Sequence, residues 1–347
     1  MKKNQIVIKI IAVWLIIVQS LYASHLKPQA VSGALEAGNK EVVYRSALPD
    51  EVLFQVRVSV SPDDHLTYLF LGSVIPIDSA DTGHYMRIYE YIPGKKVHIV
   101  DSMPVMPFNS IWTMEENGVY FEHMLLRNYD NLHLSGDTLF YYQEITYPEY
   151  DHQTDVKFTY DREYFMYVIG SEQNPIQTDE VRFRKSNRRL SVHSLENVAI
   201  SPNGNYTSRN NMYNISFLLT SDYTEDEIMQ SFKTKEVFAL PKFTTGYDLI
   251  TYFPGFEEME QPCNDEYALF GGMDWHPDGD VLFFDNSGIC YACIWMFDLK
   301  SKEVKKLVAD HEAIHPFYYE KKGQQYLAYV QENEVRRYSL GPINSQK

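Results

Sequence analysis

Residues 273–279, Met-Asp-Trp-His-Pro-Asp-Gly, and the three apolar stretches after them decide the fold of this chain. The stretches are residues 281–285, 289–298 and 303–308, and the links between them, Asn-Ser-Gly and Leu-Lys-Ser-Lys, have turn composition. A short strand before the turn and three strands after it predict a four-stranded antiparallel sheet. Its length of about forty residues is the size of one propeller blade.

The turn of this sheet recurs in weaker form at two other places. Ser61-Pro62-Asp63-Asp64 and Ser201-Pro202-Asn203-Gly204 each follow an apolar strand pattern. Proline presets the backbone of such a turn, and Asp, Asn or Gly tolerates the tight position after it. A strand-and-turn unit that recurs along the chain indicates a repeat architecture.

The sequence after the turn strengthens this interpretation. Ile294-Trp295-Met296-Phe297-Asp298-Leu299 is followed by the turn Lys300-Ser301-Lys302 and a short strand, and this order resembles the TolB-type, WD-like propeller repeat. The resemblance covers residues 273–308 almost position for position and residues 56–100 in part. It implies an all-β propeller built of four-stranded antiparallel blades.

Strand patterns along the remaining chain predict six blades in a single domain over residues 41–347, with five and seven as alternatives. The last blade lacks one strand, and residues 42–45 are the free pattern that can complete it, because propellers close by pairing an N-terminal strand into the last blade. The third blade includes residues 180–184 as a strand. The expected blades cover about residues 56–100, 110–145, 155–193, 197 onward, 273–308 and 317–340.

The composition agrees with an all-β chain. The protein has 347 residues, of which 44% are apolar and 14% aromatic, and 27 are tyrosine. Tyrosine and phenylalanine suit a pleated, half-buried surface. The alternative use of so many aromatic rings is as platforms for sugar rings.

The N-terminus is expected to be a targeting segment. Lys2 and Lys3 precede the apolar run 10–18, and a polar, small-residue stretch follows it, which is the order of a secretory signal peptide. We assign residues 1–24 to this signal, with cleavage near Ala23 or Ser24, and residues 25–40 to a flexible segment. A bilayer span needs about twenty apolar residues, so we expect no stable membrane span after cleavage, with an uncleaved anchor as the alternative. The predicted location is extracytoplasmic, either periplasmic or secreted.

The net charge excludes one class of partner. The chain carries −16 at pH 7, and removal of the signal, with three lysines and no acidic residue, makes it −19. Such a chain repels phosphate backbones, so nucleic acid is not an expected partner. One basic stretch either pairs with an acidic protein or ligand or is a solvated strand and turn: Arg182, Arg184, Lys185, Arg188 and Arg189.

The three cysteines allow one disulfide. Cys290 and Cys293 lie three positions apart in an expected strand, where their side chains point to opposite faces about 10 Å apart, too far for a bond. A disulfide from Cys263 to either of them is the remaining pairing. A redox motif is not expected, because such pairs lie at a helix N-terminus.

His311-Glu312-Ala313-Ile314-His315 matches the zinc-protease pattern, in which one helix presents both imidazoles and the glutamate activates a metal-bound water. Pro316 follows directly and disfavours helical geometry at His315. We therefore interpret the segment as a crossover between blades. His311, Glu312 and His315 are kept as catalytic candidates of low rank, and no metal or cofactor is expected.

Other chemical motifs are weak. The spacing of Asp278, Asp280 and Asp285 fits no calcium loop. Asn205 and Asn214 fit the glycosylation pattern, which matters only in a eukaryotic source.

Two function classes follow from the sequence. The first is a binding or scaffold propeller that recognises a protein, peptide or glycan through loops on one face, as the resemblance implies. The second is a propeller enzyme, such as a carbohydrate lyase or hydrolase, and the sequence favours the first. His65, His276 and His315 lie at or near expected blade turns, and their convergence with a carboxylate would favour the enzyme.

Overall fold

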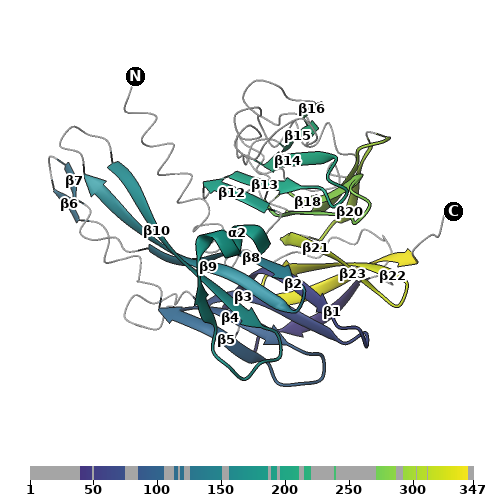
Figure 1. Cartoon of the computed structure of the whole chain (residues 1–347), viewed down its shortest axis with the longest axis horizontal. Coiled ribbons are helices and arrows are strands. Elements are labelled where there is room, and N and C mark those ends of the chain that lie inside the picture. Colours follow the sequence, from purple (N-terminus) through teal and green to yellow (C-terminus); the bar gives the residue numbers. More distant parts are fainter. Residues whose placement is uncertain are drawn as a thin grey trace. The chain divides into compact units, whose positions relative to one another are not determined.

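The computed structural model describes most of the chain from residue 40 onward (Figure 1). The described residues are 40–48, 51–74, 85–104, 113–115, 118–120, 126–150, 156–186, 189–193, 196–210, 215–219, 238–239, 271–286, 292–301, 303–310 and 312–342. The predicted signal, residues 1–24, and the flexible segment before residue 40 lie outside them, so both stay predictions.

The described chain is all-β, as predicted, with one short helix, α2 (Glu180–Ser186). No helix among the described residues is long and apolar enough to cross a membrane. The strands are β1 (Lys40–Arg45), β2 (Glu51–Val60), β3 (Leu66–Val74), β4 (Tyr85–Tyr91), β5 (His98–Pro104), β6 (Thr113–Glu115), β7 (Gly118–Tyr120), β8 (Leu126–Ser135), β9 (Thr138–Tyr150), β10 (Val156–Val168), β11 (Ile176–Thr178), β12 (Arg189–His193), β13 (Glu196–Ile200), β14 (Tyr206–Asn210), β15 (Ile215–Leu219), β16 (Phe238–Ala239), β17 (Met273–Trp275), β18 (Val281–Asp285), β19 (Ile294–Asp298), β20 (Glu303–Val308), β21 (Ala313–Lys321), β22 (Gln324–Gln331) and β23 (Glu334–Pro342).

Four-stranded antiparallel sheets are the repeating element, as expected for propeller blades. The four-stranded sheets have the orders β2-β3-β4-β5, β11-β10-β9-β8, β17-β18-β19-β20 and β1-β23-β22-β21. A fifth sheet, β12-β13-β14-β15-β16, has one strand more than expected, and β6 and β7 form a separate pair. The fold class is thus confirmed at the level of the blade, and the total of six blades stays a prediction.

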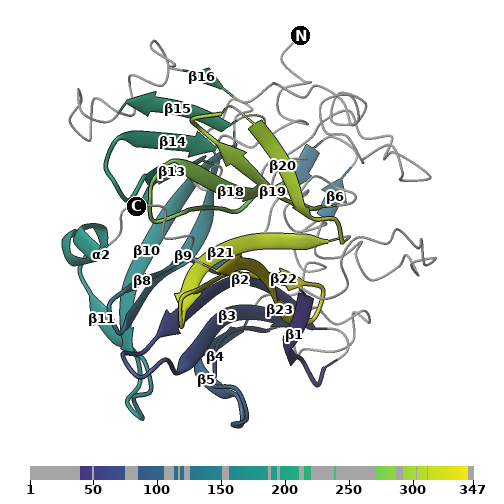
Figure 2. The ribbon, with the colours of Figure 1, turned by 90° about the vertical axis from the view of Figure 1, so that its right-hand side faces the viewer.

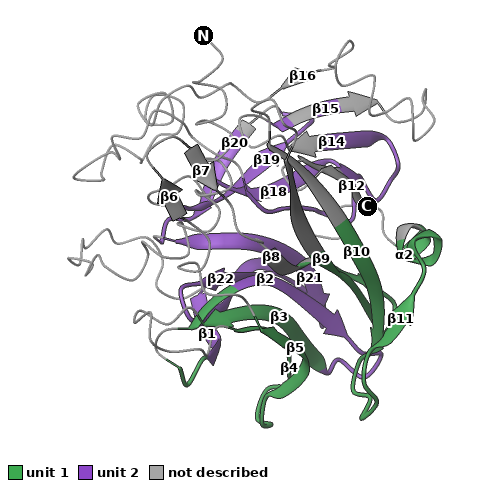
Figure 3. Cartoon of the chain, turned by 90° about the vertical axis from the view of Figure 1, so that its left-hand side faces the viewer, with its two compact units in different colours: residues 1–33, 46–53, 66–186 green, residues 34–45, 54–65, 187–347 purple. Residues whose placement is uncertain are grey.

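The chain divides into two compact units (Figure 3). Unit 1 comprises residues 1–33, 46–53 and 66–186, and unit 2 comprises residues 34–45, 54–65 and 187–347. The assignment of residues 41–347 to one propeller domain stays a prediction.

In unit 2 the sheet β17-β18-β19-β20 packs through both faces, because successive side chains of a strand point to opposite sides. Leu282 and Phe284 join a core with residues of β13 and β15, including Phe217. Phe283, between them, joins a second core with residues of β21 and β22, including Tyr318. The Phe283 and Tyr318 rings stack with centroids 5.8 Å apart. Because both faces of β18 are buried, its residues form a continuous apolar run, which gives this stretch a clear strand pattern.

The predicted closing strand is confirmed. β1 pairs antiparallel with β23, from Lys40 opposite Tyr338 to Arg45 opposite Glu334, and completes the last sheet (Figure 2). Ion pairs add to the backbone bonds: Lys40 Nζ lies 2.8 Å from Asp310 Oδ1, and Arg45 pairs with Glu334.

The predicted boundary between the second and third blades was wrong. One sheet spans residues 126–178, because β9 and β10 pair over their full lengths, from Val168 opposite Thr138 to Val156 opposite Tyr150. Pro148 and its charged neighbours favour a break, yet Pro148 lies within β9 opposite Phe158. Long-range pairing therefore outweighed the local signal.

Residues 180–184 were also assigned wrongly, since they lie in α2 rather than in a strand. Their polar–apolar alternation favours a strand, but Asp179 caps the helix by accepting the Arg182 N–H at 2.8 Å on Oδ1. Phe183 is buried against Phe140 and Tyr142. The Asp179 cap and the burial of the Phe183 ring therefore stabilise a helix here rather than a strand.

Candidate functional site

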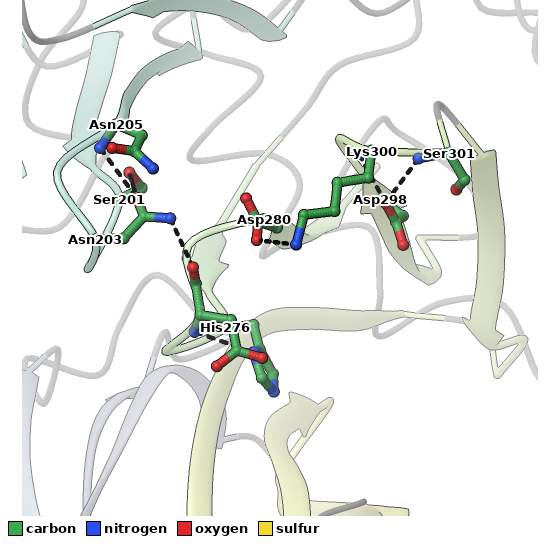
Figure 4. A network of polar contacts seen from close by, with 9 residues as sticks. Ser201, Asn203, Asn205, His276, Asp280, Asp298, Lys300 and Ser301 are labelled. Atoms are coloured by element: carbon green, nitrogen blue, oxygen red, sulfur yellow. Dashed lines mark hydrogen bonds and ion pairs between the residues drawn. The ribbon is translucent and has the colours of Figure 1, made fainter. Parts of the chain in front are cut away.

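Three turns of unit 2 form a network of polar side chains (Figure 4). They connect β13 to β14, β17 to β18, and β19 to β20. We call this group the turn network and define it by its residues: Ser201, Asn203, Asn205, His276, Asp278, Asp280, Asp298, Lys300 and Ser301.

The first turn is fixed by Asn203. Its carboxamide Oδ1 accepts hydrogen bonds from the Ser201 hydroxyl at 2.8 Å and from the Asn205 N–H at 3.0 Å. Gly204 has a φ of 75°, and its N–H donates to the Ser201 carbonyl at 2.8 Å. Asparagine and glycine are the residues that such a turn favours, as the sequence predicted.

Asn203 also joins this turn to the next sheet. Its Nδ2 donates to the backbone carbonyl of Asp278 at 2.6 Å. Gly279 makes the approach feasible, since a Cβ at that position would lie 2.3 Å from the Asn203 side chain. Gly279 also has a φ of 75°, which disfavours other residues. One carboxamide therefore holds two turns of neighbouring sheets together.

The second turn carries the His276 ring against the core. Its Nδ1 accepts the Asp278 N–H at 3.2 Å, and the ring lies edge-on to Tyr318 with centroids 4.7 Å apart. The His276 side chain is 14% exposed, whereas that of Asp278 is 77% exposed. His276 therefore positions the turn, and the Asp278 carboxylate is the group that the turn presents to solvent.

The third turn is built on Asp298. Its Oδ1 accepts the Lys300 N–H at 2.8 Å and the Ser301 N–H at 3.0 Å. The Lys300 ammonium lies 2.6 Å from Asp280 Oδ2, which raises the pKa of Lys300. The Lys300 side chain is 76% exposed and reaches back to the second turn. The network thus offers carboxylate, ammonium and amide groups at fixed positions, which suits the binding of a polar ligand.

The zinc-protease pattern does not form a helix in the described residues. β21 begins at Ala313, so Ala313 and His315 lie in a strand, and His311 is outside the described residues. The pairing with β22 shifts by one residue between Ile314 and Phe317, which is a bulge. His315 has a φ of 56°, a rare backbone conformation for a residue that is not glycine.

A buried carboxylate holds His315 in this conformation. Asp285 is fully buried, and its Oδ2 accepts the His315 N–H at 2.6 Å and the Gly272 N–H at 2.8 Å. A Cβ on Gly272 would lie 2.8 Å from the His315 Cα, so glycine is required there. Asp285 is thus a structural residue that joins β18 to β21.

Glu312, which directly precedes β21, is a carboxyl group with a strongly raised pKa. Its Oε2 is buried and has no hydrogen-bond partner among the described residues. Burial, and secondly the charge of Glu332, raise the pKa of Glu312 to about 7. Its φ of 64° places it in the same rare backbone region as His315.

The structure places the candidate residues His276 and His315 at opposite ends of β18. The His276 N–H donates to the carbonyl of Val281 at the start of β18, and the His315 N–H donates to Asp285 at the end of β18. His65 is exposed in the turn after β2, where its N–H donates to Ser61 Oγ at 3.0 Å. Among the described residues, no group of three His, Cys, Asp or Glu side chains is placed to hold a metal.

The predicted disulfide stays a prediction, because Cys263 and Cys290 lie outside the described residues. Cys293 is buried directly before β19, and burial raises the pKa of its thiol to about 12. Of the two glycosylation patterns, Asn205 is exposed in the first turn and Asn214 lies outside the described residues.

The basic stretch is divided between two elements. Arg182 and Lys185 are exposed on α2, and Arg189 begins β12. Arg184 also belongs to α2, and Arg188 lies outside the described residues.

Sequence reasoning found the turns and missed the bonds between them. Asn203 was interpreted as a turn residue only, and its bond to Asp278 spans 75 positions of the chain. The structural roles of Asp285 and Asp274 were also missed, although Asp274 Oδ2 accepts the Tyr318 N–H at 2.8 Å. The signal present was an acidic residue at the end of an otherwise apolar strand, as at Asp285.

Comparison with known proteins gives no family. No family model and no curated protein matches the chain. Among solved structures, the chain is similar to a mannose phosphorylase from Leishmania mexicana, with 8% identity over 86% of this chain and 87% of that one and a TM-score of 0.38. It is similar to an endo-arabinase from Bacteroides thetaiotaomicron, with 10% identity, 88% and 99% coverage and a TM-score of 0.39. It is also similar to TolB from Acinetobacter baumannii, with 7% identity over 84% of this chain and 55% of that one and a TM-score of 0.24. TM-scores this low support no statement about function.

Proposed function

We propose that this chain is an extracytoplasmic β-propeller binding module of the TolB-like, WD-like kind, which recognises a protein, peptide or glycan through turns on one face. The observation that carries the proposal is the turn network. Its turns are joined by the Asn203–Asp278 bond and the Lys300–Asp280 ion pair, so the exposed groups are positioned before a ligand arrives. Preorganisation of this kind lowers the entropy cost of binding.

Three exposed groups are the proposed ligand contacts: the Asp278 carboxylate, the Lys300 ammonium and the Asn205 carboxamide. They combine hydrogen-bond donors and acceptors within two neighbouring sheets. This combination suits the backbone and polar side chains of a peptide or the hydroxyl groups of a glycan.

The test uses the purified mature chain on a glycan array and on a displayed-peptide library. We expect specific binding that falls about tenfold or more in Asp278→Ala and Lys300→Ala, the loss typical of an interfacial contact. Lys305→Ala is the matched control, because Lys305 is exposed on β20 and lies outside the turn network. Equal binding by the wild type and both variants would contradict the proposal.

The proposed location rests on the N-terminal sequence. Mass spectrometry of protein exported by a cell of the source organism should show a mature chain that begins at Ser24 or His25. A chain that retains residues 1–24 and stays with the membrane would support the uncleaved anchor instead.

The second candidate is a propeller enzyme that acts on carbohydrate, and Glu312 is the observation that favours it. A carboxyl group with a pKa of about 7 suits general acid catalysis at neutral pH. A zinc peptidase using His311, Glu312 and His315 is a separate alternative of lower rank, and the strand at Ala313 and His315 counts against it. Metal analysis of the purified chain and of His315→Ala, with polysaccharide cleavage assays of Glu312→Gln, separates these classes. Bound zinc that is lost in His315→Ala, or cleavage that is lost in Glu312→Gln, would replace the binding module.

A further inference from the structure

Asn203 and Gly204 form a pair of residues that can react with each other. The side-chain carboxamide of an asparagine is open to attack by the backbone nitrogen of the next residue, and glycine hinders this attack least because it has no side chain. The chain contains two such pairs, and Asn117, which begins the other one, lies outside the described residues. Asn203 and Gly204 are both exposed, so water reaches this pair.

The reaction needs no partner other than water. The Gly204 nitrogen bonds to the Asn203 Cγ, the bond from Cγ to Nδ2 breaks, and Nδ2 leaves as ammonia with the proton that the Gly204 nitrogen gives up. One water molecule then opens the cyclic imide at either of its carbonyls. The product at position 203 is an aspartate or an isoaspartate, and either one carries a carboxylate in place of the carboxamide.

Hydrogen bonds hold both reacting groups in the folded turn. The Gly204 N–H donates to the Ser201 carbonyl at 2.8 Å, so the attacking nitrogen is engaged. The Asn203 Oδ1 accepts hydrogen bonds from the Ser201 hydroxyl at 2.8 Å and from the Asn205 N–H at 3.0 Å. Ser201 is itself fixed, because it is buried and its Oγ accepts the Tyr206 N–H at 2.9 Å. Attack on Asn203 therefore requires bonds of the turn to break.

The leaving group of the reaction is held by the neighbouring sheet. Asn203 Nδ2 donates to the Asp278 carbonyl at 2.6 Å (Figure 4). The Asn203 carboxamide also fills the space beside Gly279, where a Cβ would lie 2.3 Å away. A carboxylate at position 203 has no N–H to donate to the Asp278 carbonyl. The modification would thus break the bond that joins the two turns.

We propose that Asn203 is a deamidation site that the turn network protects, so that opening of the network lets the Gly204 nitrogen attack and leaves a carboxylate that cannot rejoin the two turns. Each molecule loses the bond between the turns once and does not regain it. The modification does not depend on the proposed ligand, because it requires only that the turns separate.

The test follows the mass of the fragment that contains residues 201–205 while the purified mature chain is kept in mildly alkaline buffer at physiological temperature. A synthetic peptide of residues 198–208 gives the rate of deamidation without the fold. We expect the folded chain to react on the order of a hundredfold more slowly than the peptide, because several hydrogen bonds must break before attack. Asn205 is an internal control, since the Tyr206 side chain hinders attack on it. Equal rates in the chain and the peptide would overturn the proposal.

Two glycine variants separate the bond between the turns from overall stability. Gly279→Ala displaces the Asn203 carboxamide from Asp278 and should speed deamidation about tenfold, the factor expected for the loss of one hydrogen bond. Gly323→Ala strains a different turn, with a φ of 70° and nothing within 4 Å of its Cβ, and should change the rate little. Circular dichroism shows that both variants are folded. Equal acceleration in the two variants would overturn the proposal, since overall unfolding would then set the rate.

The product of the reaction can also be made directly. Asn203→Asp should exchange its backbone hydrogens faster than the wild type in residues 276–280, because the Asp278 carbonyl has lost its donor. Wild-type chain that has deamidated during storage should show the same change. Exchange in residues 276–280 that is unchanged in both samples would overturn the proposal, because the carboxylate would then leave the two turns joined.

Discussion

At the residue scale, Gly279 is the residue on which the turn network most depends. Its φ of 75° disfavours a side chain, and so does the Asn203 carboxamide, which would lie 2.3 Å from a Cβ at this position. Gly279→Ala should therefore lower the free energy of unfolding by about 2–3 kcal/mol, as measured by urea denaturation. Gly323→Ala is the matched control, since Gly323 has a φ of 70° and nothing within 4 Å of the place that a Cβ would take.

The control variant should lose only the backbone term, about 1 kcal/mol. Asn203→Ala in the Gly279→Ala background should recover the steric part of the loss. Equal losses for Gly279→Ala and Gly323→Ala would show that Asn203 does not lock the two turns together.

Glu312 makes stability depend on pH in a defined direction. Its pKa is raised from 4.5 to about 7 in the folded chain, so the folded state binds the proton more tightly than the unfolded state. Stability from this group is fully present below pH about 4.5 and is lost as the pH rises to about 7. Because solvent partly screens the group, the loss should be roughly 1–2 kcal/mol rather than the full value of the shift.

Glu312→Gln should abolish this loss, so the variant should be more stable than the wild type at pH 8 and similar to it at pH 4.5. Thermal unfolding at both pH values measures the difference. Glu332→Gln should reduce the loss only in part, because burial is the larger cause of the raised pKa. A wild type whose stability changes with pH in the same way as Glu312→Gln would contradict the assignment.

The residue scale also shows where sequence reasoning succeeds. The turn roles of Pro202, Gly204 and Gly279 follow from local backbone preferences, which the sequence carries directly. The bond from Asn203 to Asp278 does not, because it depends on the packing of two sheets whose turns are 75 residues apart.

At the element scale, the attachment of β1 to β23 combines a buried carboxylate with exposed ion pairs. Glu334 is 8% exposed and binds both Arg45 and Arg336, whereas Glu41 is 57% exposed and pairs with Arg337. Glu334→Gln should lower the free energy of unfolding by about 1–2 kcal/mol, since it removes the buried carboxylate that binds both Arg45 and the half-buried Arg336.

Glu41→Gln is the matched control and should change the free energy by less than about 0.5 kcal/mol, because exposed ion pairs contribute little. Urea denaturation at low and high salt measures both variants. A larger effect of Glu41→Gln than of Glu334→Gln would mean that surface charge, rather than the buried carboxylate, attaches the strand.

The elements differ in how well the sequence predicted them. β17, β18 and β20 were predicted closely, because their turns and apolar stretches agree with one another, whereas β19 begins at Ile294 rather than at residue 289 as predicted. β9 and α2 were not, since Pro148 favours a break within β9 and the alternating residues of α2 favour a strand. In both cases a contact distant in sequence or a single cap outweighed the local pattern.

At the scale of the whole molecule, buried or half-buried carboxylates join sheets within each unit. In unit 2, Asp274 and Asp285 accept backbone N–H groups of β21. In unit 1, Glu90 binds Tyr167 and Gly170, and Asp101 accepts the Tyr141 hydroxyl at 2.7 Å. Acidic residues at these positions therefore serve the fold.

The measurement that most directly tests the proposed binding function is hydrogen–deuterium exchange over the whole chain, with and without the best ligand from the array or the peptide library. The turn network predicts slower exchange on binding in residues 201–205, 276–280 and 298–301, and no change in residues 312–315. Slower exchange in residues 312–315, with unchanged exchange in the three turns, would contradict the proposal and would place the binding site at Glu312 and His315.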